Sequence, residues 1–203
     1  MRLTAEGLTC VRSGRKVFAG LDFTVAAGEA LLVLGRNGAG KSSLLRMIAG
    51  LVPIASGTLA LDGGEGDLTL PEQTHYVGHL DAVKPALTVQ ENLEFWGQYL
   101  GGGTGALPDA PLAAVALDDL AGLPAAYLSA GQKRRLSLAR LIAVPRPIWL
   151  LDEPTSALDA AAQERLSSLM RRHLDGGGII LAATHAPIGL DAAQELRLDG
   201  LAA

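Results

Sequence analysis

The chain has 203 residues, the length of one domain or of one domain with a small addition, and 49% of them are hydrophobic, enough for a buried core. Its net charge of −4 argues against a protein dedicated to nucleic-acid backbones, and a single cysteine excludes a disulfide framework. With no apolar run near the roughly 18 residues of a membrane span and no secretion signal, we expect a cytosolic protein, which another polypeptide would have to connect to any membrane.

The first third of the chain is expected to alternate strands with turns. Short stretches at Leu3–Ala5 and Leu21–Val25 predict strands, and the apolar run Ala30–Leu34 predicts a buried parallel strand. After it, Ser42–Ala49 has the apolar spacing of a helix, with Gly50 as its C-terminal cap. Thr58–Leu61 then predicts a strand that runs into a turn of Asp and Gly residues.

A glycine-rich segment, Gly35–Ser42, connects the third strand to the first helix and fits the pattern G-x-x-x-x-G-K-S/T. Its glycines let backbone N–H groups turn toward phosphate oxygens, at the helix N-terminus where an anion is favoured. Lys41 is expected to reach the β- and γ-phosphates, and the Ser42 hydroxyl to hold Mg²⁺. The candidate ATP-binding residues here are Gly35, Asn37, Gly38, Ala39, Gly40, Lys41, Ser42 and Ser43.

The middle of the chain is expected to be mostly helical. Val89–Leu100 has amphipathic helical spacing, residues 101–105 form a glycine-rich breaker, and Pro108–Ala126 is expected to be helical in pieces. Ser129 then precedes a strong helical run, residues 133–142, for which it is a good N-cap. Taken alone, this last segment favours nothing more than a capped basic helix.

The α/β pattern returns at residue 148. The strand Ile148–Leu151 runs into Asp152 and Glu153, and because a strand directs neighbouring side chains to opposite faces, the two acids are expected to differ in role. Asp152 would support Mg²⁺, and Glu153 would activate water as a general base. A helix at Ala160–Leu174 and a strand at Ile179–Thr184 complete the pattern, and His185 at the strand end is by itself no more than a structural or exposed histidine.

Together these segments resemble the ATP-binding cassette ATPases. Residues 128–132 resemble the L-S-G-G-Q signature with Ala130 at the first glycine, Ser156–Asp159 resembles the D-loop, and His185 resembles the switch histidine. The resemblance implies an enzyme that hydrolyses ATP with Mg²⁺ and works as a homodimer. In it Ser129, Gly131 and Gln132 would contact the γ-phosphate bound by the opposite subunit, Asp159 would cross the interface, and His185 would contact the γ-phosphate and the attacking water.

The same resemblance implies an α/β fold. Its parts would be a P-loop NTPase core with a mixed or parallel sheet over about 1–84 and 144–203, an antiparallel N-terminal β part, and a small helical subdomain over about 85–143. Two positions depart from the family. Arg12 stands where an aromatic residue usually stacks on adenine, although a guanidinium can also stack on a ring. Leu80 stands at the expected glutamine of the Q-loop, where the neighbouring His79 is a candidate substitute.

Residues 78–95 follow the pattern G-H-x-x-x-x-K-x-x-L-T-x-x-E-N-L-x-F, which resembles the haem-exporter ATPases of bacterial cytochrome c-type biogenesis. The brevity of the chain and Arg12 agree with that resemblance. It implies integral membrane partner subunits of the haem-exporter permease type, a peripheral location on the cytoplasmic face of the bacterial inner membrane, and no binding of nucleic acid. ATP hydrolysis would then power haem export or delivery.

Other functions remain open at this point. The chain would fit the ATPase of an exporter of another small substrate, or a soluble cassette ATPase that clamps nucleic acid or ribosomes. The latter usually carries coiled-coil arms or two cassettes, and neither is present in the sequence. A small-molecule kinase is a weaker alternative, because it would leave Ser129–Gln132 without a purpose.

Overall fold

A computed structural model describes residues 1–101 and 110–198. Internal contacts divide the chain into two compact units. The first comprises residues 1–78, 146–154 and 170–198, and the second comprises residues 79–145 and 155–169, as far as each is described. Most of the predicted glycine-rich breaker, the start of the predicted helical stretch at residue 108, and the last residues of the chain lie outside the described residues.

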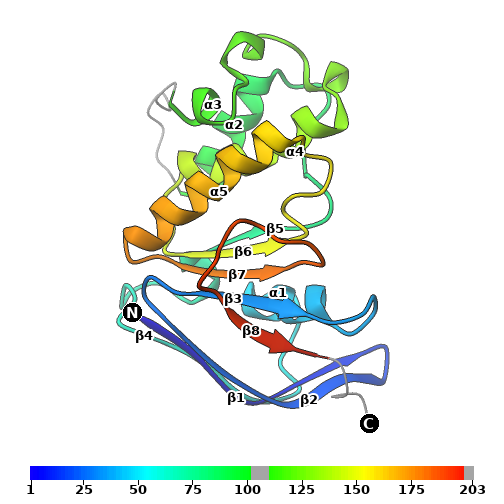
Figure 1. The fold of residues 1–203 in the computed structure, drawn as a ribbon, viewed down its shortest axis with the longest axis vertical. Coiled ribbons are helices and arrows are strands. Elements are labelled where there is room, and N and C mark those ends of the chain that lie inside the picture. Colours follow the sequence, from blue (N-terminus) through cyan, green and yellow to red (C-terminus); the bar gives the residue numbers. More distant parts are fainter. Residues whose placement is uncertain (102–109, 199–203) are drawn as a thin grey trace. The chain divides into compact units, whose positions relative to one another are not determined.

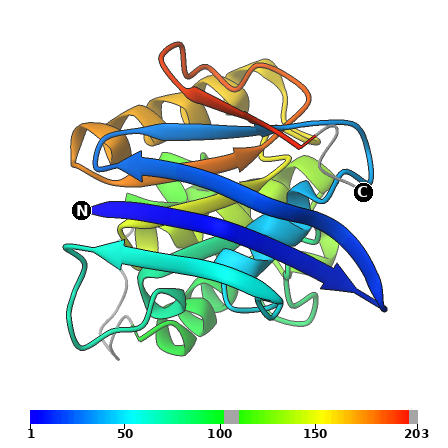
Figure 2. The ribbon, with the colours of Figure 1, turned by 90° about the horizontal axis from the view of Figure 1, so that it is seen from below.

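An antiparallel sheet of order β2-β1-β4 forms one layer of the first unit (Figure 2). Its strands are β1 (Arg2–Arg12), β2 (Arg15–Ala26) and β4 (Ser56–Asp62). Both β2 and β4 pair antiparallel with β1. The register shifts at irregularities in the pairing of β1 with β2 and in its pairing with β4. Apolar side chains alternate with exposed ones along β2, so one face of this sheet is buried.

A parallel sheet of order β5-β6-β7-β3-β8 forms the other layer (Figure 1). The strands are β3 (Ala30–Leu34), β5 (Thr74–Val77), β6 (Ile148–Asp152), β7 (Ile179–Ala183) and β8 (Gln194–Arg197). Every residue of β6 and β7 is buried, as expected for central parallel strands covered on both faces. A short 3₁₀ turn, η1 (Pro71–Gln73), leads into β5.

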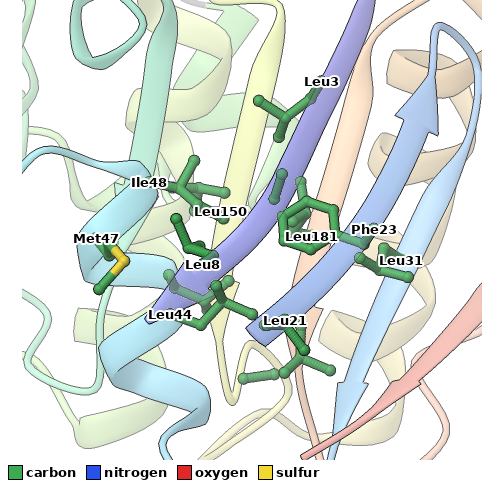
Figure 3. Packing of buried hydrophobic residues seen from close by; sticks show 14 of the residues in the cluster. Leu3, Leu8, Leu21, Phe23, Leu31, Leu44, Met47, Ile48, Leu150 and Leu181 are labelled. Carbon is green, nitrogen blue, oxygen red and sulfur yellow. The ribbon is translucent and has the colours of Figure 1, made fainter. Parts of the chain in front are cut away.

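The first unit closes around a core to which both sheets and helix α1 (Lys41–Ile48) contribute (Figure 3). Leu8 of β1, Leu44 of α1 and Leu150 of β6 are each fully buried in it. Because α1 packs on β1, β6 and β7, the loop that precedes this helix is fixed to the centre of the parallel sheet.

The second unit is helical. Its elements are α2 (Val89–Tyr99), α3 (Ala110–Ala114), η2 (Asp118–Leu120), η3 (Ala125–Tyr127) and α4 (Ala130–Ala143), together with the first part of α5 (Ala160–Asp175). Thr88 caps α2 in a capping box with Glu91. The core of this unit includes Val89, Leu93 and Leu136.

The predicted α/β class with an antiparallel N-terminal sheet and a helical part is confirmed. The first two strands are much longer than predicted, because their register shifts interrupt the apolar alternation from which strands are read. Strands β5 and β8, which hold only four residues each, were not predicted. Across the described part of the chain, no helix has the length and apolar character needed to cross a bilayer.

Candidate active site

The candidate site lies in the first unit, at the carboxyl ends of three adjacent strands of the parallel sheet. The order β6-β7-β3 places the end of β6, the end of β7 and the loop after β3 along one edge. Ligands of open α/β sheets bind outside the carboxyl ends of the strands. Asp152 ends β6, His185 follows β7 by two residues, and residues 35–40 follow β3.

The loop between β3 and α1 has a backbone that only glycine adopts easily. Gly35, Gly38 and Gly40 have φ angles of 147°, 84° and 103°. A Cβ atom at Gly40 would also lie 2.6 Å from Cγ1 of Val17. The N-terminus of α1 receives no side-chain cap and has no acidic residue in its first turn, so its amide N–H groups suit an anion.

Lys41 lies inside this loop with only 7% of its surface exposed. Its Nζ donates to the carbonyl oxygens of Gly35 (2.7 Å) and Arg36 (3.2 Å), and lies 2.9 Å from Nε2 of His185. The amine is therefore held at the place where the loop would present it to a phosphate.

Glu153 and His185 meet at the same point. Oε1 of Glu153 lies 3.5 Å from Nε2 of His185, so this ring nitrogen faces both the carboxylate and the amine of Lys41. Glu153 has a φ of 47°, a conformation that costs energy for a residue with a side chain, and its N–H donates to Ala183 O (2.9 Å). Thr184 Oγ1 accepts from the N–H of Ala186 (3.1 Å) and donates to its carbonyl (2.7 Å), which fixes the turn that carries His185.

Asp152 is buried, with 3% of its surface exposed. Its Oδ2 accepts from the hydroxyl of Tyr76 (3.4 Å), and the same hydroxyl accepts from Nε of Arg46 (3.0 Å). Burial raises the pKa of Tyr76, so its hydroxyl keeps the proton that it donates. The sequence did not point to Tyr76 or Arg46. Arg46 is 30 positions before Tyr76, and Tyr76 is 76 positions before Asp152, so no motif links them.

The donor set suits Mg²⁺. A carboxylate on Asp152 and a hydroxyl on Ser42 are hard oxygen ligands, and Mg²⁺ usually takes one or two protein ligands together with substrate phosphates. Within residues 1–101 and 110–198, no group of three or more His, Cys, Asp or Glu side chains is placed to hold a metal ion alone. The hydroxyl of Ser42 and the carboxylate of Asp152 thus fit a metal ion that substrate phosphates also hold.

The signature-like segment lies in the second unit, where it forms the start of α4. Ser129 and Gln132 make a capping box: the N–H of Gln132 donates to Ser129 Oγ (3.2 Å), and the N–H of Ser129 donates to Gln132 Oε1 (2.8 Å). A Cβ at Gly131 would lie 2.8 Å from the carbonyl oxygen of Ala157, whereas Ala130 is exposed. This explains locally why alanine fits at position 130 and glycine is needed at 131.

Asp159 has a structural contact in the second unit that the sequence analysis did not anticipate. Its Oδ1 accepts from the N–H of Ala162 (2.7 Å), which makes it the cap of α5.

Arg12 and Leu80, the two residues that depart from the family pattern, are exposed. Arg12 pairs with Arg15 at the end of the β1–β2 hairpin, and the side chains against Gly40 of the phosphate loop are instead those of Val17 and Phe18. Leu80 has 81% of its surface exposed, and His79 beside it is also exposed. The segment is anchored one residue later, where Asp81 makes an ion pair of 3.3 Å with the buried Arg134 of α4.

A phosphate loop beside a strained glutamate and a histidine, on adjoining strands of a parallel sheet, is the arrangement of a P-loop nucleotide hydrolase. The model of the ABC transporter family matches residues 18–156. The chain therefore belongs to the ABC transporter family, as an ATP-binding subunit that hydrolyses ATP.

Curated relatives place it more narrowly. It is similar to proteins named cytochrome c biogenesis ATP-binding export protein CcmA from three bacteria. The identity is 63% for Nitrobacter winogradskyi, 60% for Bradyrhizobium diazoefficiens and 64% for Rhodopseudomonas palustris strain BisB18, over 100% of both chains in each case.

Solved structures agree with the fold. An ATP-binding subunit of an ABC transporter matches 91% of this chain and 80% of its own, with a TM-score of 0.80 and 25% identity. A bacterial Atm1-family ABC exporter with ATP bound matches 98% of this chain and 37% of its own, with a TM-score of 0.82 and 25% identity.

Proposed function

We propose that this chain is the ATP-hydrolysing motor subunit of a membrane complex that exports or delivers haem in cytochrome c biogenesis. The observation that carries the proposal is the meeting of Lys41, Glu153 and His185 at one ring nitrogen, in a chain whose close relatives are named for cytochrome c biogenesis export.

The site residues would divide the work as follows. Lys41 and the amides of the phosphate loop bind the terminal phosphates, releasing the contact of Lys41 with His185 when nucleotide enters. Glu153 accepts a proton from the attacking water. His185 orients that water and the γ-phosphate, and its Nε2 lies 3.5 Å from the Glu153 carboxylate. Ser42 and Asp152 would hold Mg²⁺, which supplies charge neutralisation at the phosphates when bound.

The second half of the site would come from another copy of the chain. Ser129 and Gln132 bond to each other in their capping box, and the N-terminus of α4 presents amide groups to an anion. In a homodimer, this helix start would cover the γ-phosphate bound by the phosphate loop of the partner. Asp159 would lie at the interface between the two copies.

The membrane connection is also part of the proposal. We place the dimer on the cytoplasmic face of the inner membrane, bound to integral subunits of the haem-exporter permease type. The exposed Leu80 and the loop anchored by Asp81 would then sense those subunits in place of a glutamine contact.

Purification of the tagged protein from membranes of its source cell tests this function. The proposal predicts co-purification of integral membrane subunits, haem in the complex, and release of inorganic phosphate from ATP without a phosphorylated product. A protein that hydrolyses ATP but binds nucleic acid or ribosomes, and no membrane subunit, would contradict it.

A further inference from the structure

Two strands and one helix of the first unit bring three polar side chains into a chain of hydrogen bonds. Arg46, in the last turn of α1, donates from Nε to the hydroxyl of Tyr76 on β5 at 3.0 Å. That hydroxyl donates to Oδ2 of Asp152 at 3.4 Å. We propose that Tyr76 and Arg46 are positioning residues, which orient the Asp152 carboxylate toward the metal of the bound nucleotide; this inference rests on the proposed function.

Strand pairing explains why Tyr76 reaches Asp152. In the parallel register of β5 and β6, Tyr76 lies opposite Leu150. Side chains two residues apart on a strand share a face, so Asp152 lies on the same face as Leu150 and diagonally next to Tyr76. The tyrosine therefore reaches the carboxylate from the adjacent strand.

The residue after this strand leaves room for the ring. A Cβ at Gly78 would lie 3.0 Å from both Cε1 and the hydroxyl oxygen of Tyr76. Contacts of this length are tighter than nine in ten that real Cβ atoms make, so any larger residue would press on the ring. Gly78 thus keeps open the space in which the hydroxyl lies beside Asp152.

Charge gives the hydrogen-bond chain its direction. The Arg46 guanidinium has only donors, so the Tyr76 oxygen must accept from it and its own proton is left for Asp152. A carboxylate that accepts this hydrogen bond on Oδ2 is restrained in rotation, which fixes the direction in which it can face a metal ion. Replacing a side chain that orients a metal ligand in this way typically lowers the affinity for the metal.

The test measures metal affinity rather than turnover. Purified full-length protein is incubated with a fluorescent, non-hydrolysable ATP analogue, and Mg²⁺ is titrated into it while fluorescence is recorded. Tyr76→Phe, which keeps the ring and removes the hydroxyl, should weaken the apparent Mg²⁺ affinity by about threefold to tenfold. Binding of the analogue in EDTA should stay within about twofold of wild type, because the phosphate loop is untouched.

Three further variants complete the design. Tyr99→Phe is the matched control, because Tyr99 is 71% exposed, and it should titrate like wild type. Arg46→Gln combined with Tyr76→Phe should bind Mg²⁺ within about twofold of Tyr76→Phe alone, because Arg46 reaches Asp152 mainly through its hydrogen bond to the hydroxyl and its direct charge interaction with Asp152 is smaller. Gly78→Ala should weaken Mg²⁺ affinity with the hydroxyl still present, which keeps the test informative if Tyr76→Phe folds poorly.

Asp152→Asn separates the two levels of the proposal. If it loses Mg²⁺ dependence while Tyr76→Phe and Gly78→Ala titrate like wild type, the positioning role is wrong and the metal assignment stands. If Asp152→Asn itself titrates like wild type, Asp152 is not the metal ligand. Both the proposed metal site and the positioning role are then wrong.

Discussion

At the scale of single residues, the proposed mechanism depends most on Glu153 as the general base. Its carboxylate lies 3.5 Å from His185, and its backbone is held at a φ of 47°. Backbone strain of this kind persists where the surrounding structure imposes it, as in active sites. The fold therefore holds the Glu153 carboxylate in a defined position beside His185.

Replacing Glu153 by glutamine should abolish turnover while leaving ATP binding intact. The amide cannot accept the proton of the attacking water, and loss of a general base costs roughly 10²- to 10⁴-fold in rate. Phosphate release and equilibrium ATP binding measure the two effects. Glu6→Gln, on the exposed part of β1, is the control and should hydrolyse ATP normally. Near-normal hydrolysis by Glu153→Gln would remove Glu153 from its role.

Gly131→Ala should slow hydrolysis without preventing nucleotide binding. The added methyl group would lie 2.8 Å from the Ala157 carbonyl oxygen, so the start of α4 or the D-loop must shift. Shifts of about 1 Å can cost up to about 10²-fold in rate. Gly122→Ala meets no atom within 4 Å and should hydrolyse ATP like wild type. Equal rates for the two variants would show that this close approach does not matter.

At the scale of elements, α2 and the loop before it form one hydrogen-bonded assembly. Asn92 has 1% of its surface exposed, and its Oδ1 accepts from the N–H of Lys84 (2.7 Å). Its Nδ2 donates to the carbonyl oxygens of Lys84 (3.0 Å), Leu87 (3.3 Å) and Thr88 (2.9 Å). One buried amide thus fixes the loop that follows Leu80.

Asn92→Ala should lower the free energy of unfolding by about 1–3 kcal/mol, because the Lys84 N–H loses this acceptor and the three hydrogen bonds from the amide to carbonyl oxygens are lost. Urea denaturation measures the change. Gln98→Ala, on the exposed side of the same helix, should change stability by less than about 0.5 kcal/mol. If the two variants denature at the same urea concentration, the amide does not fix the loop.

The packing of α5 against β6 adds a pH dependence. The His173 ring stacks on Trp149 with ring centroids 3.9 Å apart, and burial lowers the pKa of His173 below its ordinary value of 6.5. The folded state thus disfavours protonation, so the contribution of this neutral ring is complete above pH 6.5 and declines as the pH falls through 6.5 toward the lower folded pKa.

His173→Phe keeps a stacked ring that does not titrate. Its thermal stability should fall less than that of wild type when the pH is lowered from 7.5 to 5.5, values of about one unit on either side of 6.5. Differential scanning fluorimetry across this range measures the difference. Identical pH profiles would show that His173 does not titrate between the folded and unfolded states.

At the scale of the whole molecule, the features that could be predicted from the sequence are those that a short local segment specifies. Gly35–Ser42 was identifiable because the loop conformation needs glycines at fixed positions, and Ser129 because a helix start needs a cap. The α/β class followed from buried apolar runs such as Ile148–Leu151. By contrast, the Arg46–Tyr76–Asp152 contacts depend on the pairing of β5 with β6 and on the packing of α1, which no local pattern encodes.

The central claim is that each ATP is held between the phosphate loop of one copy and the helix start of another, and mixing two inactive variants tests it most directly. Lys41→Ala lacks the phosphate contact and Ser129→Arg blocks the start of α4, so neither homodimer should hydrolyse ATP. In a mixed dimer, the intact loop of one variant faces the intact helix start of the other. The account predicts that mixing restores phosphate release, to about a quarter of the wild-type rate if random pairing makes half the dimers mixed, each with one intact site. If the mixture stays as inactive as its components while mixed dimers are present, or if Ser129→Arg alone turns over normally, the shared site does not exist.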